Sequence, residues 1–155
     1  MANNNDIRYC LEAYLDTIPF LPGVFNENLN DFPQDPLSHI ATRFVPTSNR
    51  AVTTGDNPWR KKLGYFQVTV RVPINSGTGE QLEYADRIET SFSPGKFLSV
   101  TKSSLTLKMD FTNSLYSLDD KTLTVVIDYA EASGSYEESP YYCTPVSIGW
   151  HCHNL

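Results

Sequence analysis

The C-terminal end of the sequence holds the densest group of residues that could bind a metal ion. Cys143 is followed by the consecutive residues His151, Cys152 and His153, and thiolate and imidazole groups are ligands of zinc sites. Consecutive residues of an extended chain point to opposite sides, so at most two of these three converge on one ion. The sequence also has no Cys-x-x-Cys pair. We therefore expect no metal and no cofactor, and we interpret the run as part of a segment that packs against a neighbouring subunit.

Two pairs of adjacent acids could in principle serve general acid and base catalysis. Residues 119–120 are both Asp, and residues 137–138 are both Glu. A catalytic pair needs a pocket that holds the substrate within reach of both groups, whereas adjacent acids are common in solvated turns. We interpret both pairs as turn residues.

Motifs for a nucleophile or a nucleotide are missing from the sequence. His39 has no Ser or Cys nucleophile motif around it, and no Gly-x-Ser-x-Gly occurs. Gly77 and Gly79 precede a predicted helix, but the third glycine of a dinucleotide-binding loop is absent, and helix capping explains them. These patterns predict that the protein is not an enzyme.

The strongest candidate for a functional surface is a basic cluster beside a tryptophan. Four of the 12 Lys and Arg residues lie within residues 47–63, a polar stretch that we expect to form a long loop. Such a loop could contact an acidic partner or phosphates, or it could be a solvated loop end onto which the tryptophan folds. The candidate residues for contact with a partner or subunit are Arg50, Trp59, Arg60, Lys61 and Lys62.

The composition favours one folded domain with an acidic surface. Of the 155 residues, 40% are hydrophobic and 19% are charged, which argues against disorder and against a coiled coil. The 12 Lys and Arg against 18 Asp and Glu give a net charge of −6, and negative charge repels phosphate backbones. We therefore expect no specific DNA binding, and note that this charge suits a surface past which DNA slides.

The cysteines and the apolar runs predict a protein kept in a cytoplasm. Cys10, Cys143 and Cys152 are an odd number, so we expect free thiols in a reducing compartment. No apolar run approaches the ~20 residues that cross a bilayer, so we expect no membrane contact. The first residues lack the charged and then apolar layout of a signal peptide.

The elements that must position these residues are two helices and several strands. Apolar residues recur with helical spacing in residues 6–18 and 79–92. The predicted buried stripe of the second helix consists of Leu82, Ala85, Ile88 and Phe92. Alternation of apolar and polar residues predicts strands at 38–46, 64–73, 105–111 and 123–129, with a short strand near 24–26.

This order of helices and strands predicts an α+β fold. We expect a mixed or mainly antiparallel sheet of four to five strands that packs against the two helices. Residues 131–155 are rich in Ser, Tyr and Pro and have weak periodicity. We therefore predict a domain at 1–130 and a C-terminal extension at 131–155.

The predicted strands and helices also carry a resemblance to a known family. Residues 64–73 read Gly-Tyr-Phe-Gln-Val-Thr-Val-Arg-Val-Pro, and residues 85–88 of the following helix read Ala-Asp-Arg-Ile. The first helix opens with Ile7-Arg8 and is followed by Leu21-Pro22. In order and spacing, residues 6–130 resemble the tail terminator proteins of long-tailed bacteriophages, which are also called tail-completion or minor tail proteins. Residues from 131 onward depart from the usual family ending.

The resemblance implies a structural virion protein without catalytic residues. Members of this family form a six-membered ring that caps the head-proximal end of the tail tube, at the neck of the virion. The ring stops tube polymerisation and offers a surface for head-tail joining. The implied partners are other copies of the chain, the tail tube protein and a head-completion or connector protein, with DNA passing through the opening. Assembly is implied to occur in the host cytoplasm.

Three other functions fit the sequence less well and stay open at this point. The first is another head-tail connector or a tail-tube subunit, which would form open-ended stacks. The second is a small metal-dependent or hydrolytic enzyme that uses His39 or the C-terminal Cys and His run. The third is direct DNA binding through the basic loop, which predicts retention on DNA that falls steeply with salt.

Overall fold

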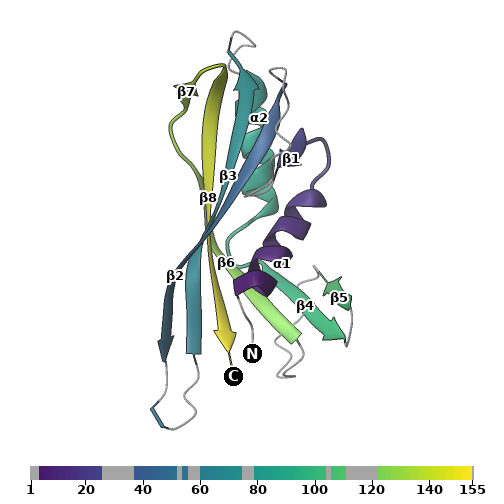
Figure 1. Cartoon of the computed structure of the whole chain (residues 1–155), viewed down its shortest axis with the longest axis vertical. Coiled ribbons are helices and arrows are strands. Elements are labelled where there is room, and N and C mark those ends of the chain that lie inside the picture. The colour runs from purple at the N-terminus through teal and green to yellow at the C-terminus, as the bar shows by residue number, and fades with distance from the viewer. Residues whose placement is uncertain are drawn as a thin grey trace.

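A computed structural model of the chain describes residues 4–25, 37–51, 54–55, 60–74, 79–103, 106–110 and 122–154. Within these residues the chain forms two helices and eight strands (Figure 1). In chain order they are α1 Asn4–Asp16, β1 Gly23–Phe25, β2 His39–Ala51, β3 Arg60–Pro73, α2 Gly79–Ser91, β4 Phe97–Ser103, β5 Thr106–Asp110, β6 Thr122–Ala132, β7 Tyr136–Glu138 and β8 Tyr141–Asn154. The predicted α+β class is confirmed.

All the strands belong to one sheet, in the order β1-β2-β3-β8-β6-β4-β5, with β7 paired to β8. Strand β1 runs parallel to β2, and the other pairings among the described residues are antiparallel. The sheet is therefore mixed, as predicted, but it has more strands than the four to five expected. The additional strands are β4, β7 and β8, in stretches where no strand was predicted.

Both helices pack on the same face of the twisted sheet (Figure 1). The apolar stripe of α1 is buried, with Ile7, Cys10 and Leu11 among the fully covered side chains. Helix α2 buries Ala85 and Ile88, and the following Phe92 packs edge-on against Tyr14 with ring centroids 4.9 Å apart. Neither described helix is long and apolar enough to cross a membrane.

The predicted long loop at residues 47–63 is wrong over most of its length. Strand β2 continues to Ala51, and β3 begins at Arg60. The two strands stay paired throughout, with one bulge between Pro46 and Ser48. The polar side chains hide this extension from the sequence pattern, because a strand that projects past the core needs no apolar face.

The predicted extension at 131–155 is also wrong, because it supplies a central strand of the sheet. Strand β8 lies between β3 and β6 and pairs with β3 along its whole length. Its residues Val146, Ile148 and Trp150 are fully buried or nearly so and belong to the main core. Within β8 the residues do alternate, with Val146, Ile148 and Trp150 on the buried face and Ser147 and His151 less buried on the other. The Ser, Tyr and Pro residues that precede this stretch obscure the alternation when residues 131–155 are considered as a whole.

Candidate subunit-contact surface

The four basic residues of the predicted contact set lie at the far end of the long hairpin formed by β2 and β3 (Figure 1). The antiparallel register places Arg50 opposite Lys61 and Ala51 opposite Arg60. Lys62 lies opposite Asn49 on one side and Cys152 of β8 on the other. The structure therefore brings the four basic residues together at one end of the molecule.

The pleat of the two strands divides these four residues between the two faces of the sheet. Arg50 and Lys61 are directly opposite and share one face, whereas Arg60 and Lys62 share the other. Lys62 is half-buried, and its Nζ lies 3.5 Å from the side-chain oxygen of Asn4 at the start of α1. Lys62 thus contacts the domain itself, and the outward contact surface consists of Arg50, Arg60 and Lys61.

The electrostatics of this surface favour a negatively charged partner. No ion pair is formed by Arg50, Arg60 or Lys61 with any residue that the structure describes. Like charges directly opposite on two strands destabilise the pair by ~0.2–1 kcal/mol. The Arg50–Lys61 arrangement costs the monomer stability, and acidic groups of a partner would offset this cost.

Trp59, the aromatic member of the predicted cluster, lies outside the described residues. Arg43 is a further basic residue of β2 that the clustering in sequence misses. It is exposed, lies opposite Gln67 of β3, and forms no ion pair with the described residues. The alternation of β2 is the signal that could have found it, because it predicts which residues of the strand point outward.

The C-terminal Cys and His residues are held apart by the structure. Cys143 and Cys152 lie at opposite ends of β8, and both are buried. Burial, together with the smaller effect of the charge on nearby Cys152, raises the pKa of the Cys10 thiol to about 12. Burial likewise raises the pKa of Cys152 to about 12. Within the described part of the chain, no three His, Cys, Asp or Glu residues are grouped so that they could hold a metal ion.

The two candidate histidines are held by other contacts. His39 is buried, its ring Nδ1 lies 3.0 Å from the carbonyl of Leu37, and burial lowers its pKa. His151 lies at the surface of β8, with its Nδ1 2.6 Å from a carboxylate oxygen of Asp128. These two histidines lie in different strands and have different partners, so they do not form a joint site.

The acids of residues 137–138 lie in a strand and not in a turn, which corrects the sequence interpretation. Glu138 forms an ion pair with Arg71 of β3, at 3.7 Å. Residues 119–120 lie outside the described residues, as do Gly77 and the residue after it. Gly79 is the first residue of α2.

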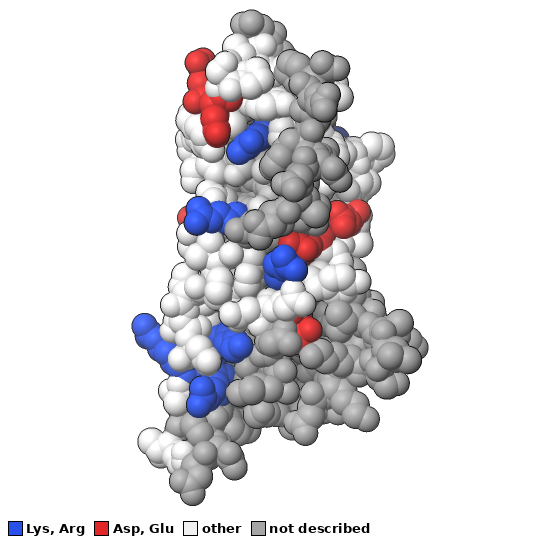
Figure 2. All heavy atoms as spheres, in the orientation of Figure 1, with Lys and Arg blue, Asp and Glu red and all other residues white. Residues whose placement is uncertain are grey.

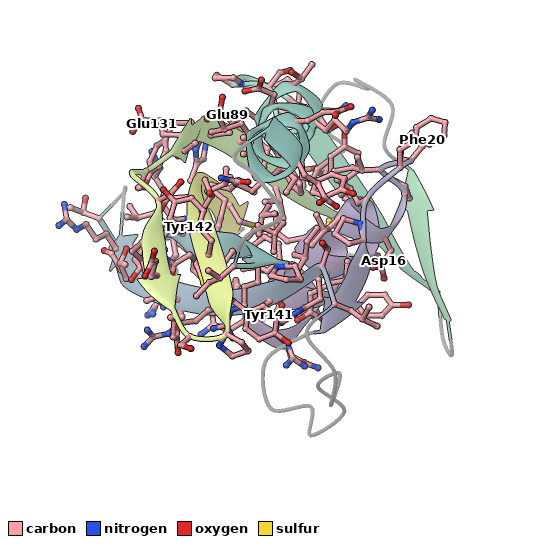
Figure 3. The ribbon with its side chains drawn as sticks, turned by 90° about the horizontal axis from the view of Figure 1, so that it is seen from above. Asp16, Phe20, Glu89, Glu131, Tyr141 and Tyr142 are labelled. Atoms are coloured by element: carbon pink, nitrogen blue, oxygen red, sulfur yellow. The ribbon has the colours of Figure 1, made fainter. Side chains whose placement is uncertain are left out.

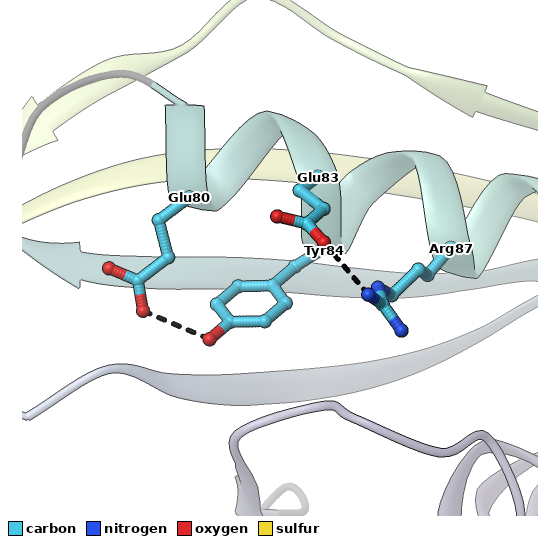
Figure 4. Close-up of polar contacts among 4 residues, drawn as sticks. All are labelled: Glu80, Glu83, Tyr84 and Arg87. Carbon is cyan, nitrogen blue, oxygen red and sulfur yellow. Dashed lines mark hydrogen bonds and ion pairs between the residues drawn. The ribbon is translucent and has the colours of Figure 1, made fainter.

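Helix α2 carries two polar pairs along its axis (Figure 4). The Tyr84 hydroxyl donates to Glu80 at 2.9 Å, and the Arg87 guanidinium donates to Glu83 at 2.8 Å. Both pairs have i, i+4 spacing, which stabilises an exposed helix face by a few tenths of a kcal/mol. They account for much of the charge on this helix without a functional role.

One exposed aromatic residue was not singled out by the sequence. Phe20 is 79% exposed and has a φ of 62°, which is costly for a residue with a bulky side chain. Its ring lies 5.2 Å from the guanidinium carbon of Arg87. Figure 3 shows Phe20 projecting from the rim of the molecule on the side opposite Glu131. It borders a shallow groove between α1 and α2, lined by Ile18, Pro19, Glu83, Asp86, Arg87, Thr90 and Ser91.

Comparison with known families shows which family the chain belongs to. A sequence model of the family described as phage tail terminator protein matches residues 6–150. The chain belongs to the phage tail terminator family. This family comprises structural proteins of the phage tail rather than enzymes, so the chain has a structural role in the tail of the virion. The match includes β7 and most of β8, so the family region continues past the predicted boundary at residue 130.

Solved structures share the fold of this family member. Fourteen chains of known structure are similar to it. One of them is 18% identical to this chain and has a TM-score of 0.61. The alignment covers 100% of this chain and 98% of the other chain. At that identity the likeness concerns the fold alone. No curated protein matches the chain.

Proposed function

We propose that this chain forms a ring that caps the head-proximal end of the tail tube. The ring stops tube polymerisation and then provides the surface for joining the head. The single observation that carries this proposal is the match to the tail terminator family along residues 6–150. The match spans nearly all the described elements, including the central strand β8.

The proposed partners are other copies of the chain, the tail tube protein and a head-completion protein. A closed ring needs two different surfaces on each subunit, because each copy contacts one neighbour in front and another behind. The β2–β3 hairpin supports this requirement, since its basic end carries Arg50, Arg60 and Lys61 without a counter-charge in the described part of the chain.

The net charge of −6 supports the passage of DNA through such a ring. Acidic side chains around an opening repel the phosphate backbone, so the DNA passes without adhering.

Tails assembled without this protein test the proposal most directly. We expect tubes longer than normal that do not join heads, and restoration of normal length when the protein is supplied. Tubes of normal length joined to heads in its absence would contradict the proposal. Electron microscopy of the purified protein separates a terminator from a tube subunit, because a terminator remains a monomer or single ring and a tube subunit forms open stacks.

Replacing Trp59 and Arg60 with Ala tests the proposed contact role of the hairpin. We expect the domain to fold normally and to bind the tube or the neighbouring subunit less tightly. Normal capping and assembly with this double substitution would remove these two residues from the contact surface.

A further inference from the structure

The strands that pair with β8 on its two sides carry charges of opposite sign. Strands β2 and β3 contain no Asp or Glu, and their charged residues are Arg43, Arg50, Arg60, Lys61, Lys62 and Arg71. Strands β6 and β7 contain no Lys or Arg, and their charged residues are Asp128, Glu131, Glu137 and Glu138. Strand β8, which lies between the two groups, contains none of these four residue types. The sign of the charge therefore changes from the β2–β3 side of β8 to the β6–β7 side.

On each side of β8, part of a strand has no further strand beside it in the described structure. Strand β1 pairs with only the first three residues of β2, so in the described structure β2 is the outer strand from Thr42 to Ala51. On the other side, β4 pairs with β6 along Thr122–Val126 only. Beyond that point, β6 and then β7 are the outer strands beside β8 within the described residues.

Several charges on these outer strands have no counter-charge in the described structure. Arg50 and Lys61 form no ion pair on the basic side. Glu131 and Glu137 are exposed and form none on the acidic side. By contrast, Glu138 forms an ion pair with Arg71, and Asp128 is hydrogen-bonded to His151. The unpaired charges thus have opposite signs on the two outer edges.

The charges of the two edges also lie at different levels along the sheet. Lys61 is level with His153 at one end of β8 and Glu137 with Tyr142 at the other, whereas Glu131 is level with Ser147 near the middle. Figure 2 shows Lys and Arg side chains gathered near the lower end, over the far part of β2 and β3, and Asp and Glu side chains near the upper end beside β7. Two different patches that attract each other give a head-to-tail contact, and repetition of such a contact closes a ring when the rotation per copy allows it. Complementary charge fixes the register of a contact more than it adds affinity.

The positions of these unpaired charges indicate which surface of a neighbouring copy is complementary to the basic hairpin. We propose that the β2–β3 edge of one copy, through Arg50 and Lys61, docks on the β6–β7 edge of the next copy, through Glu131 and Glu137. The contact is made by side chains, because Pro46 and the bulge beside it interrupt the ladder of β2 that main-chain pairing would need. This inference rests on the proposed ring and names the surfaces that would close it.

Two charge-reversed variants of the full chain test the contact. Variant A carries Arg50→Glu and Lys61→Glu, and variant B carries Glu131→Lys and Glu137→Lys. Each variant alone has two edges of like charge, so we expect its self-association to weaken by about tenfold or more. An equal mixture restores attraction at both edges, so we expect alternating assemblies of A and B. Association is measured by analytical ultracentrifugation at low and high salt, since salt screens these contacts.

A control variant with Glu83→Lys and Asp86→Lys makes the same charge change as variant B on the outer side of α2. We expect it to associate like the wild type. Equal association of A, B and the wild type, or failure of the mixture to assemble when the wild type does, would overturn the proposal. Thermal unfolding of each variant separates loss of the contact from loss of the fold.

Zero-length crosslinking with a carbodiimide gives a second readout, in purified tails as well as in solution. With isotopically light and heavy copies mixed, we expect a crosslink between Lys61 of one copy and Glu131 or Glu137 of another. Crosslinks from Lys61 to the tube protein or to a head protein alone would overturn the proposal and leave the capping function standing. Tubes of normal length in the absence of the protein would instead overturn the capping function, whatever the crosslinks show.

Discussion

At the scale of single residues, the structure shows which potentially reactive side chains are buried in the packed interior. Cys10 lies in α1, whereas Cys143 and Cys152 lie at opposite ends of β8, and all three are buried. Burial raises the pKa of each thiol, so little of the reactive thiolate forms near neutral pH. The cysteines, which the sequence offers as candidate metal ligands, therefore form no joint site within the described structure.

The cysteines should therefore resist alkylation in the native protein. We expect iodoacetamide at pH 8 to modify Cys10 and Cys152 only after the chain is unfolded, with Cys143 also protected. Intact mass spectrometry with and without denaturant measures the number of modified thiols. Rapid modification of Cys10 in the folded protein would contradict its burial.

Arg50 offers a residue-scale test of the charge arrangement on the hairpin. Arg50→Glu places an acid opposite Lys61, so we expect the monomer to gain ~0.2–1 kcal/mol of unfolding free energy. Chemical denaturation measures the change. Arg43→Glu is the matched control, because its opposite residue Gln67 is neutral and no gain is expected. A loss of stability in Arg50→Glu that exceeds the control would contradict the unfavourable pairing.

At the scale of elements, the close packing of the strands depends on two glycines. A Cβ at Gly64 would collide with the carbonyl oxygen of Val45 and would lie 2.8 Å from a ring carbon of Trp150. A Cβ at Gly149 would collide with the ring of Tyr129, which is partly exposed and can move. The backbone of Val45 cannot move away as easily as the side chain of Tyr129 can, so the collision at Gly64 is harder to relieve.

Alanine at these two positions should therefore have unequal effects. We expect Gly64→Ala to cost about 1–3 kcal/mol of unfolding free energy through overpacking, and Gly149→Ala to cost less. Urea unfolding measures both. Adding Tyr129→Ala should recover part of the loss in Gly149→Ala and none in Gly64→Ala. Equal losses in the two alanine variants would contradict this difference.

Strand β8 is the element on which the sheet depends most. A chain that ends at residue 140 lacks the strand between β3 and β6, together with the buried Trp150. We expect it to lose cooperative unfolding, since the two halves of the sheet no longer share a pairing. Thermal unfolding followed by circular dichroism checks this, with a chain lacking only residue 155 as control. A sharp transition in the shorter chain would show that β8 is dispensable.

At the scale of the whole molecule, charge is distributed so that the domain is acidic overall and basic at one end. The net charge is −6, yet β2 and β3 carry only basic charged residues. An overall negative field keeps phosphates away, while the basic end remains available for an acidic protein surface. The two features together favour a protein contact over a nucleic-acid contact.

The whole protein should therefore not be retained on DNA. We expect no measurable binding to duplex DNA at ~0.15 M salt, and at most weak retention at lower ionic strength, where phosphate contacts strengthen. Filter binding or fluorescence anisotropy over a salt series measures this. Tight binding that Arg50→Glu abolishes would contradict the inference and would assign the hairpin to DNA.

The sequence by itself determined the two helices, the presence of strands β1, β2, β3, β5 and β6, and the family. Residues such as Ile7, Cys10 and Leu11 repeat with the period of a helix, and residues 64–73 alternate with the period of a strand, because these segments have one buried face and one open face. The basic cluster was also visible, since its members are neighbours in sequence. Leu82 shows the limit of this logic, because it fits the stripe of α2 and is nevertheless 52% exposed.

Only the tertiary structure decided the place of β8, the length of the hairpin and the sides on which its charges lie. The alternation of residues 146–152 is that of a strand, but it does not contain the position of β8 between β3 and β6. The separation of Arg50 from Lys62 and the placement of Glu131 and Glu137 at the other edge depend on register. Register is set by pairing between strands far apart in the chain, and no local pattern of residues contains it.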